Sequence, residues 1–347
     1  MRLFSAFATV ACLGVLVPLA ASVPSPRQAP RATKASAADA TAKIVAASRA
    51  FLATLDAGGK AKVQLAYAAP EKSTGWSNLP IGMVPRNGIR MGDLTPAQRT
   101  AAMAVLAAAF SQDGYRKVTE TVLGDETLRT NAGGGSRIQF GKDEYFLAFL
   151  GAPSTTAPWM LQFGGHHLAI NLTLAGPRGT LAPSLTGAQP GRFTFEGRTI
   201  RPLGKENDKA FALMAALDAT QRSQAILGYT VSDLVLGPGK DGRTIQPEGL
   251  RASAMTPAQQ AMLLDLAREW AGIANDALAA PRLDEIKANL AQTWFAWSGP
   301  TTDGSVAYFR IQGPTLVIEY APQGSLDHIH TIYRDPTNDY GAKFMAK

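Results

Sequence analysis

An internal repeat constrains the fold of this chain more than any other feature of its sequence. Residues 88–98, GIRMGDLTPAQ, match residues 249–259, GLRASAMTPAQ. Each Thr-Pro-Ala-Gln sequence predicts a helix start, in which Thr95 or Thr256 caps the helix, proline takes the first helical position and glutamine reaches back to the cap. Neighbouring segments match in the same order, so we interpret the repeat as a duplication rather than as chance similarity.

The segments that follow the two predicted helices match over a longer stretch. Residues 146–176 align without a gap with residues 294–324. Both segments alternate in polarity, are rich in aromatic and β-branched side chains, and have turn residues at matching positions, which predicts three antiparallel strands in each. The sequence therefore predicts an α+β fold of two pseudo-symmetric repeats, about residues 38–180 and 190–347. Each repeat consists of helices followed by an antiparallel β-meander.

The N-terminus differs in composition from the repeats. Residues 1–22 contain an early arginine, a short apolar run and small residues near the end, which predicts a cleaved signal peptide rather than a membrane anchor. Residues 23–37 are rich in proline, alanine and basic residues without periodicity, which predicts a disordered linker. We therefore expect residues 38–347 to form a single duplicated domain. It is expected to be secreted or periplasmic, with no stable membrane insertion after signal cleavage.

The composition argues against several classes of partner and cofactor. The formal net charge is +7, but the basic residues are scattered, whereas a nucleic-acid-binding protein concentrates them on one face. The only cysteine, Cys12, lies in the predicted signal peptide, so the mature chain offers no thiolate for a soft metal. The chain also lacks a phosphate-loop motif and a dinucleotide-binding motif. We expect no nucleic-acid partner and no nucleotide, flavin, haem or iron–sulfur cofactor.

All four histidines fall in two short clusters. The first is the adjacent pair His166 and His167, which follows a glycine at the second turn of the first predicted meander. The second repeat makes the matching turn with Pro314 and Thr315. The fold therefore does not need histidine at this turn, which favours a functional role for the pair.

The second cluster lies in HIHTIYR, whose alternation predicts a strand. His328 and His330 then share one face of this strand and can bind one metal ion from the same side. Because adjacent residues of an extended chain point to opposite faces, we expect only one of His166 and His167 to join them. Three imidazoles and a water form the ligand set of a catalytic zinc ion. The histidines therefore indicate a site for Zn²⁺ or another divalent metal.

Two other interpretations of this region stay open at the level of the sequence. In metal-free catalysis, one histidine acts as a general base, Asp335 or Asp339 orients it, and Arg334 binds an anionic group of the substrate. In the metal interpretation, the same aspartates lie behind a ligand histidine. In the structural interpretation, these polar residues only close the last strand onto the sheet.

Three further residues are candidate substrate contacts. Trp159 lies in the strand before the His166–His167 turn, and Arg310 occupies a polar strand position in the second repeat. Tyr340 lies in the polar tail after the last strand. Each has a structural interpretation as well, because aromatic residues in strands are more often core and polar strand residues often face water.

Several motifs taken together resemble a known family. GHHL, PGKDGR, PEGLRAS, FAWSG, HIHTIYRDP and NDYG are similar to the family called Domain of Unknown Function 3500. The resemblance runs from about residue 40 to the end of the chain. It implies a secreted protein of bacteria or fungi and adds no chemistry, since the family has no established activity. The motif positions that it covers are His166, His167, His328, His330, Asp339, Tyr340 and Gly341.

The sequence leads to two functional hypotheses and leaves open whether the protein is an enzyme. The first is a secreted metal-dependent hydrolase with a three-histidine site, in which the bound water is the nucleophile. The alternative is a non-catalytic extracellular module with structural histidines. That module binds a small-molecule or polymer ligand in a cleft between the repeats, with Arg310, Arg334 and Trp159 as contacts.

Overall fold

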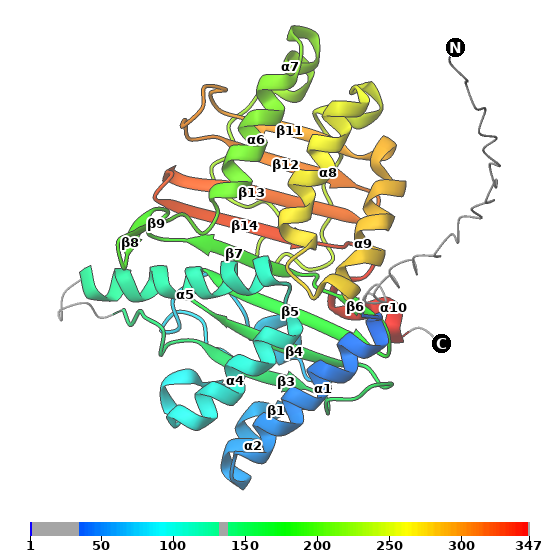
Figure 1. Cartoon of the computed structure of the whole chain (residues 1–347). Helices are drawn as coiled ribbons and strands as arrows, with labels where there is room; N and C mark the ends of the chain where they lie inside the picture. The colour runs from blue at the N-terminus through cyan, green and yellow to red at the C-terminus, as the bar shows by residue number, and fades with distance from the viewer. Residues whose placement is uncertain (2–34, 132–137, 346–347) are drawn as a thin grey trace. The chain divides into compact units, whose positions relative to one another are not determined.

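The two segments whose sequences match lie in one twelve-stranded, mostly antiparallel sheet, and with the helices this confirms the α+β class (Figure 1). The strands are β1 (Gln64–Leu65), β2 (Ile89–Arg90), β3 (Phe146–Leu150), β4 (Trp159–Gly165), β5 (Leu168–Ala175), β6 (Arg178–Thr180), β7 (Ser184–Ala188), β10 (Leu250–Arg251), β11 (Trp294–Ser298), β12 (Tyr308–Gly313), β13 (Leu316–Ser325) and β14 (His328–Arg334). They run in the spatial order β1-β3-β4-β5-β7-β14-β13-β12-β11-β10, with β2 beside β3 and β6 beside β5. A separate hairpin consists of β8 (Phe193–Phe195) and β9 (Arg198–Ile200).

The computed structural model describes Met1 and residues 35–131 and 138–345. The predicted signal peptide, apart from Met1, and most of the predicted linker lie outside the described residues. The described residues from Ala35 onward form one compact unit. None of the helices in the described part of the chain has the length and apolar character that a membrane span requires.

Two antiparallel meanders meet at the centre of the sheet. One consists of β3, β4 and β5, and the other of β11, β12 and β13. Between them, β7 pairs with β5 on one side and with β14 on the other, and β14 pairs with β13. The junction of the two meanders is therefore the β7–β14 pair.

Six of the described helices cover one face of the sheet (Figure 1). Their apolar side chains and those of the strands form a continuous core between the two layers. The six helices are α1 (Ala37–Ala53), α4 (Pro96–Ala109), α5 (Gln112–Asn131), α6 (Gly204–Ala216), α8 (Pro257–Ala271) and α9 (Asp276–Ala288). The shorter helices are α2 (Ala57–Val63), α3 (Glu71–Thr74), α7 (Ala219–Ala225), α10 (Ala342–Met345) and the 3-10 turns η1 (Met91–Asp93), η2 (Ala252–Ala254), η3 (Leu290–Gln292) and η4 (Asp339–Gly341).

The two predicted capping boxes are present. The Thr95 hydroxyl accepts a hydrogen bond from the backbone N–H of Gln98, and Thr256 does the same with Gln259. In both cases the glutamine side chain accepts from the backbone N–H of the cap residue. Each box starts a helix after a short strand and a 3-10 turn, in the order β2-η1-α4 and β10-η2-α8. Local sequence therefore sets the start of both helices.

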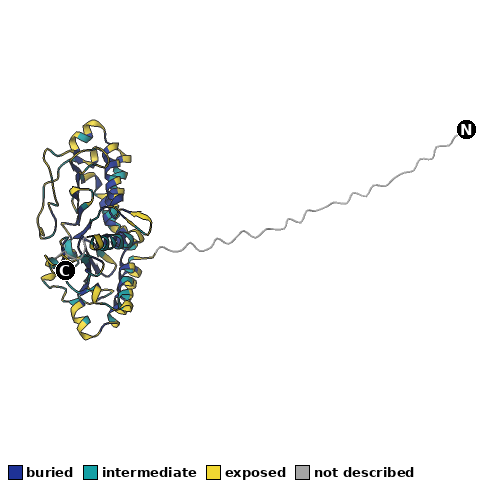
Figure 2. Ribbon diagram, turned by 90° about the vertical axis from the view of Figure 1, so that its left-hand side faces the viewer, coloured by how far each residue is buried: buried dark blue, intermediate teal, exposed yellow. Residues whose placement is uncertain are grey.

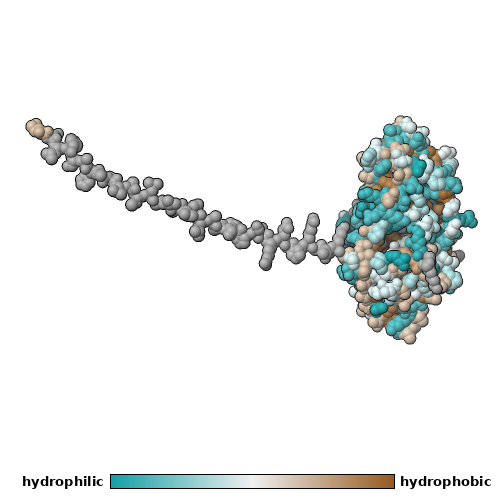
Figure 3. Space-filling model, turned by 90° about the vertical axis from the view of Figure 1, so that its right-hand side faces the viewer, coloured by the Kyte–Doolittle hydropathy of each residue, from teal (hydrophilic) through white to brown (hydrophobic). Residues whose placement is uncertain are grey.

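The other face of the sheet is covered by two segments with little regular structure, residues 66–88 and 227–249. Trp76 of the first segment and Leu234 of the second pack against Ile332 and other apolar residues of the sheet. In the view of Figure 2, the buried residues follow the strands between the helical layer and these segments. Hydrophobic residues on the surface form several separate patches among hydrophilic ones on the face shown in Figure 3.

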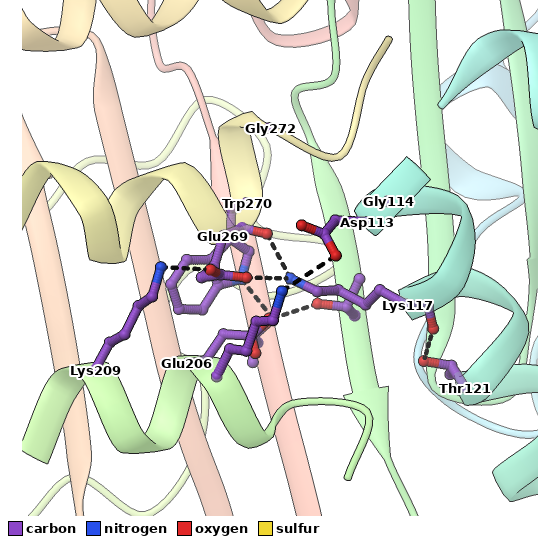
Figure 4. A network of polar contacts seen from close by, with 12 residues as sticks. Asp113, Gly114, Lys117, Thr121, Glu206, Lys209, Glu269, Trp270 and Gly272 are labelled. Atoms are coloured by element: carbon purple, nitrogen blue, oxygen red, sulfur yellow. Dashed lines mark hydrogen bonds and ion pairs between the residues drawn. The ribbon is translucent and has the colours of Figure 1, made fainter. Parts of the chain in front are cut away.

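A buried ion pair joins α5 to α6 (Figure 4). Nζ of Lys117 on α5 contacts Oε1 of Glu206 on α6, and the two side chains are only 2% and 0% exposed. Lys117 also donates to the backbone carbonyl of Glu269 on α8 at 2.5 Å. Burial raises the pKa of Glu206 above its ordinary value, and the nearby ammonium of Lys117 opposes that rise. Each charge in this pair therefore depends on the other for compensation.

We expect Lys117→Met to lower the free energy of unfolding by about 3–5 kcal/mol, because it leaves the Glu206 carboxylate buried without its counter-charge. Chemical denaturation measures the loss. The matched control is Lys205→Met, which removes an exposed ion pair with Asp113 whose side chains are 48% and 69% exposed. The control is expected to change stability by less than about 1 kcal/mol. Equal losses in the two variants would contradict a special role for the buried pair.

Candidate metal centre

The order of the strands brings the two histidine clusters together. His166 and His167 form the two-residue turn between β4 and β5, and His328 and His330 lie at the start of β14. β7 lies between β5 and β14, and its residue Gly187 is paired with His330. The backbone N–H of Gly187 donates to the carbonyl of His167 at 2.6 Å. His167 and His330 therefore lie on either side of one glycine.

Gly187 leaves room for His167 to reach β14. A Cβ atom at this glycine would lie 3.0 Å from Cδ2 and 3.1 Å from Cβ of His167, closer than most real contacts. His167 has a φ of 59°, a left-handed conformation that is uncommon for a residue with a side chain. Neither Pro314 nor Thr315 in the matching turn has a positive φ. The turn and the glycine together allow the imidazole of His167 to lie across β7.

The imidazoles of His167, His328 and His330 converge on one point. Nε2 of His328 lies 2.9 Å from Nε2 of His167 and 3.1 Å from Nε2 of His330. The ligand nitrogens of all three residues lie within 4.8 Å of one another. Nitrogen ligands of a tetrahedral zinc ion, at their usual metal distance, are about 3.3 Å apart. This group of three histidines therefore has the spacing to hold one metal ion.

Hydrogen bonds alone do not account for this convergence. In a neutral imidazole, Nε2 either donates one hydrogen bond or offers one lone pair. Nε2 of His328 faces two other Nε2 atoms, so a proton on one of them satisfies only one of the two contacts. A cation at the centre satisfies all three nitrogens at once, because each directs a lone pair toward it.

The electrostatics of the site favour neutral imidazoles. Burial lowers the pKa of His167 well below its ordinary value, and the neighbouring histidines lower it further. Burial, followed by the effects of His330 and His166, lowers the pKa of His328 to about 4. At pH 7 both rings are uncharged and offer a lone pair, which is the form that binds metals.

Two residues of the covering segments, Asp233 and Asn78, contact the ring of His330. Oδ1 of Asp233 lies 3.2 Å from Nδ1 of His330. Such a contact favours a proton on Nδ1 and leaves Nε2 free for a metal, as in carboxylate–histidine–zinc arrangements. Burial acts to raise the pKa of Asp233, but hydrogen bonds from His330 and the backbone of Leu234 hold it below its ordinary value. The amide nitrogen of Asn78 lies 3.4 Å from both ring nitrogens of His330.

His166 points away from the group of three. Its Nδ1 lies 2.7 Å from Oδ1 of Asp125 on α5, and its backbone carbonyl accepts from the hydroxyl of Tyr145 at 2.8 Å. Its ring packs against the ring of His167, with centroids 3.7 Å apart. His166 therefore supports the side of His167 that faces away from β14.

The family model described as a protein of unknown function, DUF3500, matches residues 37–342. The chain belongs to the DUF3500 family. The match confirms the resemblance expected from the motifs, and it includes both meanders and all four histidines. No curated protein and no solved structure matches the chain.

In this DUF3500 chain, the acidic groups predicted to orient the histidines have other partners. Asp335 pairs with Arg282 at 3.2 Å, and Asp339 pairs with Arg334 at 2.7 Å. Both aspartates follow the C-terminal end of β14, whereas the histidines lie at its start. Five residues of extended strand separate His330 from Asp335, which is about 16 Å. The carboxylates that contact imidazoles are instead Asp233 and Asp125.

Arg334 does not offer a free guanidinium to a substrate. Its side chain is 3% exposed and pairs with Asp241 and Asp339. It also donates to the backbone carbonyls of Leu236 and Gly237 at 2.7 and 3.0 Å. Arg334 therefore anchors the segment of residues 227–249, which also contains Asp233, onto β14.

The three predicted substrate contacts also have internal partners. Trp159 is buried, packs against Phe149, and donates its indole N–H to the backbone carbonyl of Ser154. Arg310 is buried and pairs with Glu248 at 2.9 Å. The hydroxyl of Tyr340 accepts from the indole N–H of Trp76 at 3.0 Å and lies 2.9 Å from Oδ2 of Asp241. Tyr340 therefore joins the two covering segments to each other.

Sequence reasoning did not find four residues that shape the site: Gly187, Asp233, Asn78 and Asp125. Asp233 and Asn78 lie in irregular segments, where no periodicity predicts which side chain turns toward the sheet. Asp125 lies in a helix whose charged residues are spread over its length. Gly187 offered the only local signal, as a glycine inside a strand, which often marks a close approach of other atoms.

Gly187→Ala tests the packing of His167 across β7. We expect a loss of about 1–3 kcal/mol in the free energy of unfolding, because the new methyl group crowds the ring of His167 and the carbonyl of Ile329. The matched control is Gly228→Ala, since an added Cβ there meets nothing within 4 Å. Urea denaturation of the two variants and the parent measures both changes. A Gly187→Ala variant as stable as the control would contradict the close packing.

Proposed function

We propose that this protein binds one divalent transition-metal ion, zinc in the first instance, through Nε2 of His167, His328 and His330, and that it is a metal-dependent hydrolase. The observation behind this proposal is the convergence of three imidazole nitrogens on one point. Imidazole ligands suit zinc, copper, iron and nickel, whereas magnesium and calcium prefer oxygen ligands. The burial of two of the three rings supports a built site over a chance surface cluster.

The number of ligands supports a catalytic site over a purely structural one. Structural zinc sites are closed by four protein ligands, and catalytic sites have three and an open position. The described residues provide three histidines within reach of one ion. His328 is only partly buried and the side chain of Asp233 is 57% exposed, so solvent reaches one side of the group. A metal ion held in this way activates water for attack on a substrate.

The residues around the histidines have distinct roles in this proposal. Asp233 holds the proton on Nδ1 of His330 and so keeps Nε2 available to the ion. Asn78 fixes the backbone of His167 by accepting its N–H at 3.2 Å. Arg334 positions the segment that contains Asp233. The aspartate and arginine therefore act on the site through other residues.

We also propose that the two repeats arose by duplication and that the protein acts outside the cytoplasm. The common order of strands, turns and helices supports the duplication. The signal-like sequence of residues 1–22 supports export. In this view the first repeat gained its histidines at a turn where the second retains Pro314 and Thr315, and the substrate is an extracellular small molecule or polymer.

The metal content of histidine variants distinguishes the proposed ligands from His166. We expect untagged protein to contain about one equivalent of metal by elemental analysis, and His167→Ala and His328→Ala to lose it because each removes one of three ligands. His166→Ala is the matched control, since its ring faces Asp125, and it is expected to retain the metal. Metal-free parent protein that also fails to bind added zinc would overturn the proposal.

Hydrolysis is tested on the same preparations with chromogenic esters, phosphoesters and glycosides. Turnover that is lost with a chelator, restored by zinc and absent in His328→Ala is the expected result. Stoichiometric metal without turnover of any tested bond would leave metal binding in place and contradict the hydrolase assignment for those bond types.

Asp233→Asn tests the orientation of His330. We expect zinc affinity to fall by about 10–100-fold, because the amide binds the Nδ1 hydrogen more weakly than the carboxylate does. Competition with a chromophoric chelator measures the affinity. Asp284→Asn on the exposed surface of α9 is the matched control and is expected to leave affinity unchanged. Equal affinity in both variants would exclude Asp233 from the site.

A further inference from the structure

An apolar cavity lies between α4 and α5, lined by none of the histidines. Its volume is about 380 Å³, within the range of small-molecule pockets. The two helices meet at Phe110–Ser111 and diverge from there across the sheet (Figure 1). The cavity occupies the angle between them. Its floor includes Phe163 of β4 and Met91 of η1.

Apolar side chains line the cavity both near the junction of α4 and α5 and one turn farther along each helix. Leu106 on α4 and Val118 on α5 are fully buried and lie near the junction of the two helices. Met103 and Val122 lie one turn farther along each helix and are only partly buried. The wall therefore exposes hydrocarbon to a space that water fills at a cost in free energy. Met103 is flexible and polarisable, which suits contact with a hydrocarbon chain.

Cationic groups lie at the rim of the cavity. Arg99, one turn beyond Met103 on α4, is neutralised by Asp143 at 2.6 Å. Lys142 also lines the cavity, and among the described residues its ammonium makes no ion pair. Glu126, whose pKa the charge of Lys142 helps to lower, is itself paired with Arg129 at 2.6 Å. The rim therefore has, beside an apolar interior, one ammonium that makes no ion pair within the described part of the chain.

We propose that this cavity binds an amphiphile with a hydrocarbon tail and an anionic head group such as a carboxylate. The tail lies between α4 and α5 on Phe163, and the head group pairs with Lys142. The enclosure between two helices favours a narrow chain over the flat surface of a protein partner. The charge at the rim favours an anion over a cation of the same tail length. This site is independent of the metal site proposed above.

Titration calorimetry of the untagged full-length chain with three twelve-carbon probes tests the proposal; the two ionic probes are kept below their critical micelle concentrations and the alcohol below its solubility limit. Dodecanoate is expected to bind in a one-to-one ratio. Dodecanol and dodecyltrimethylammonium, with neutral and cationic heads, are expected to bind more weakly. Equal binding of all three, or binding of none, would overturn the assignment.

Two substitutions locate the bound probe. Lys142→Glu is expected to weaken dodecanoate by about fivefold or more, as for a partly exposed ion pair, and to strengthen dodecyltrimethylammonium. Met103→Trp fills the cavity and is expected to abolish binding of dodecanoate. If that variant does not fold, Leu123→Trp at the partly exposed end of the same cavity replaces it. Met83→Trp, at an exposed methionine outside the cavity, is the matched control.

The outcomes are distinguishable from those for the metal centre, because none of these variants touches a histidine and calorimetry with dodecanoate needs no turnover. Unchanged dodecanoate binding in folded Met103→Trp or Leu123→Trp would overturn the cavity as the site. Unchanged binding in Lys142→Glu would overturn the assignment of the head group.

Discussion

The pairing of β7 with β14 is the constraint on which the rest of this structure depends. It joins two antiparallel meanders into one sheet and sets Gly187 opposite His330. Residues alternate between the faces of a strand, so a slip of one residue would turn His328 and His330 toward the helices. A contact on the helical face of β14 also fixes the register, because the hydroxyl of Thr331 accepts a hydrogen bond from the indole N–H of Trp270 at 2.8 Å. In addition to this pairing of strands, the contact between Lys117 and Glu206 links α5 to α6.

Arg334 and Tyr340, which follow the histidines in the sequence, affect the site by fixing the two covering segments. Arg334 binds two backbone carbonyls and two carboxylates, and with these contacts it fixes residues 236–241. Tyr340 contacts both Asp241 and Trp76, so it fixes the first covering segment, residues 66–88, as well. Asp233 and Asn78 approach His330 from these two segments. The polar tail thus supports the site without supplying a ligand.

The sequence was sufficient to predict the features that arise from local pattern. The capping boxes at Thr95 and Thr256, the meanders and the α+β class follow from periodicity and turn residues, and all are present. The three-histidine group was also predicted from spacing, because the alternation of side chains along a strand puts His328 and His330 on one face. The choice of His167 over His166 depends on a left-handed turn residue and on Gly187, which no periodic pattern encodes.

The error over the acidic partners has a different physical cause. Asp335 and Asp339 are near the histidines in sequence, but an extended strand converts that proximity into distance. Asp233 is about 100 residues away from His330 in sequence and reaches it through an irregular segment held by Arg334. Contacts of this kind depend on tertiary structure. A single sequence therefore predicts the three histidines better than it predicts Asp233 and Asn78, which contact them.

The position of β14 also has a consequence for the order of folding. It is the last strand in the chain, yet it occupies the centre of the sheet, and its partner β7 lies about 140 residues earlier. Each meander can form from local contacts as it emerges, whereas this final insertion must wait for nearly the whole polypeptide and closes a long loop. The imidazoles of His167, His328 and His330 meet only in that step, so the three-histidine group exists only after β14 has joined the sheet.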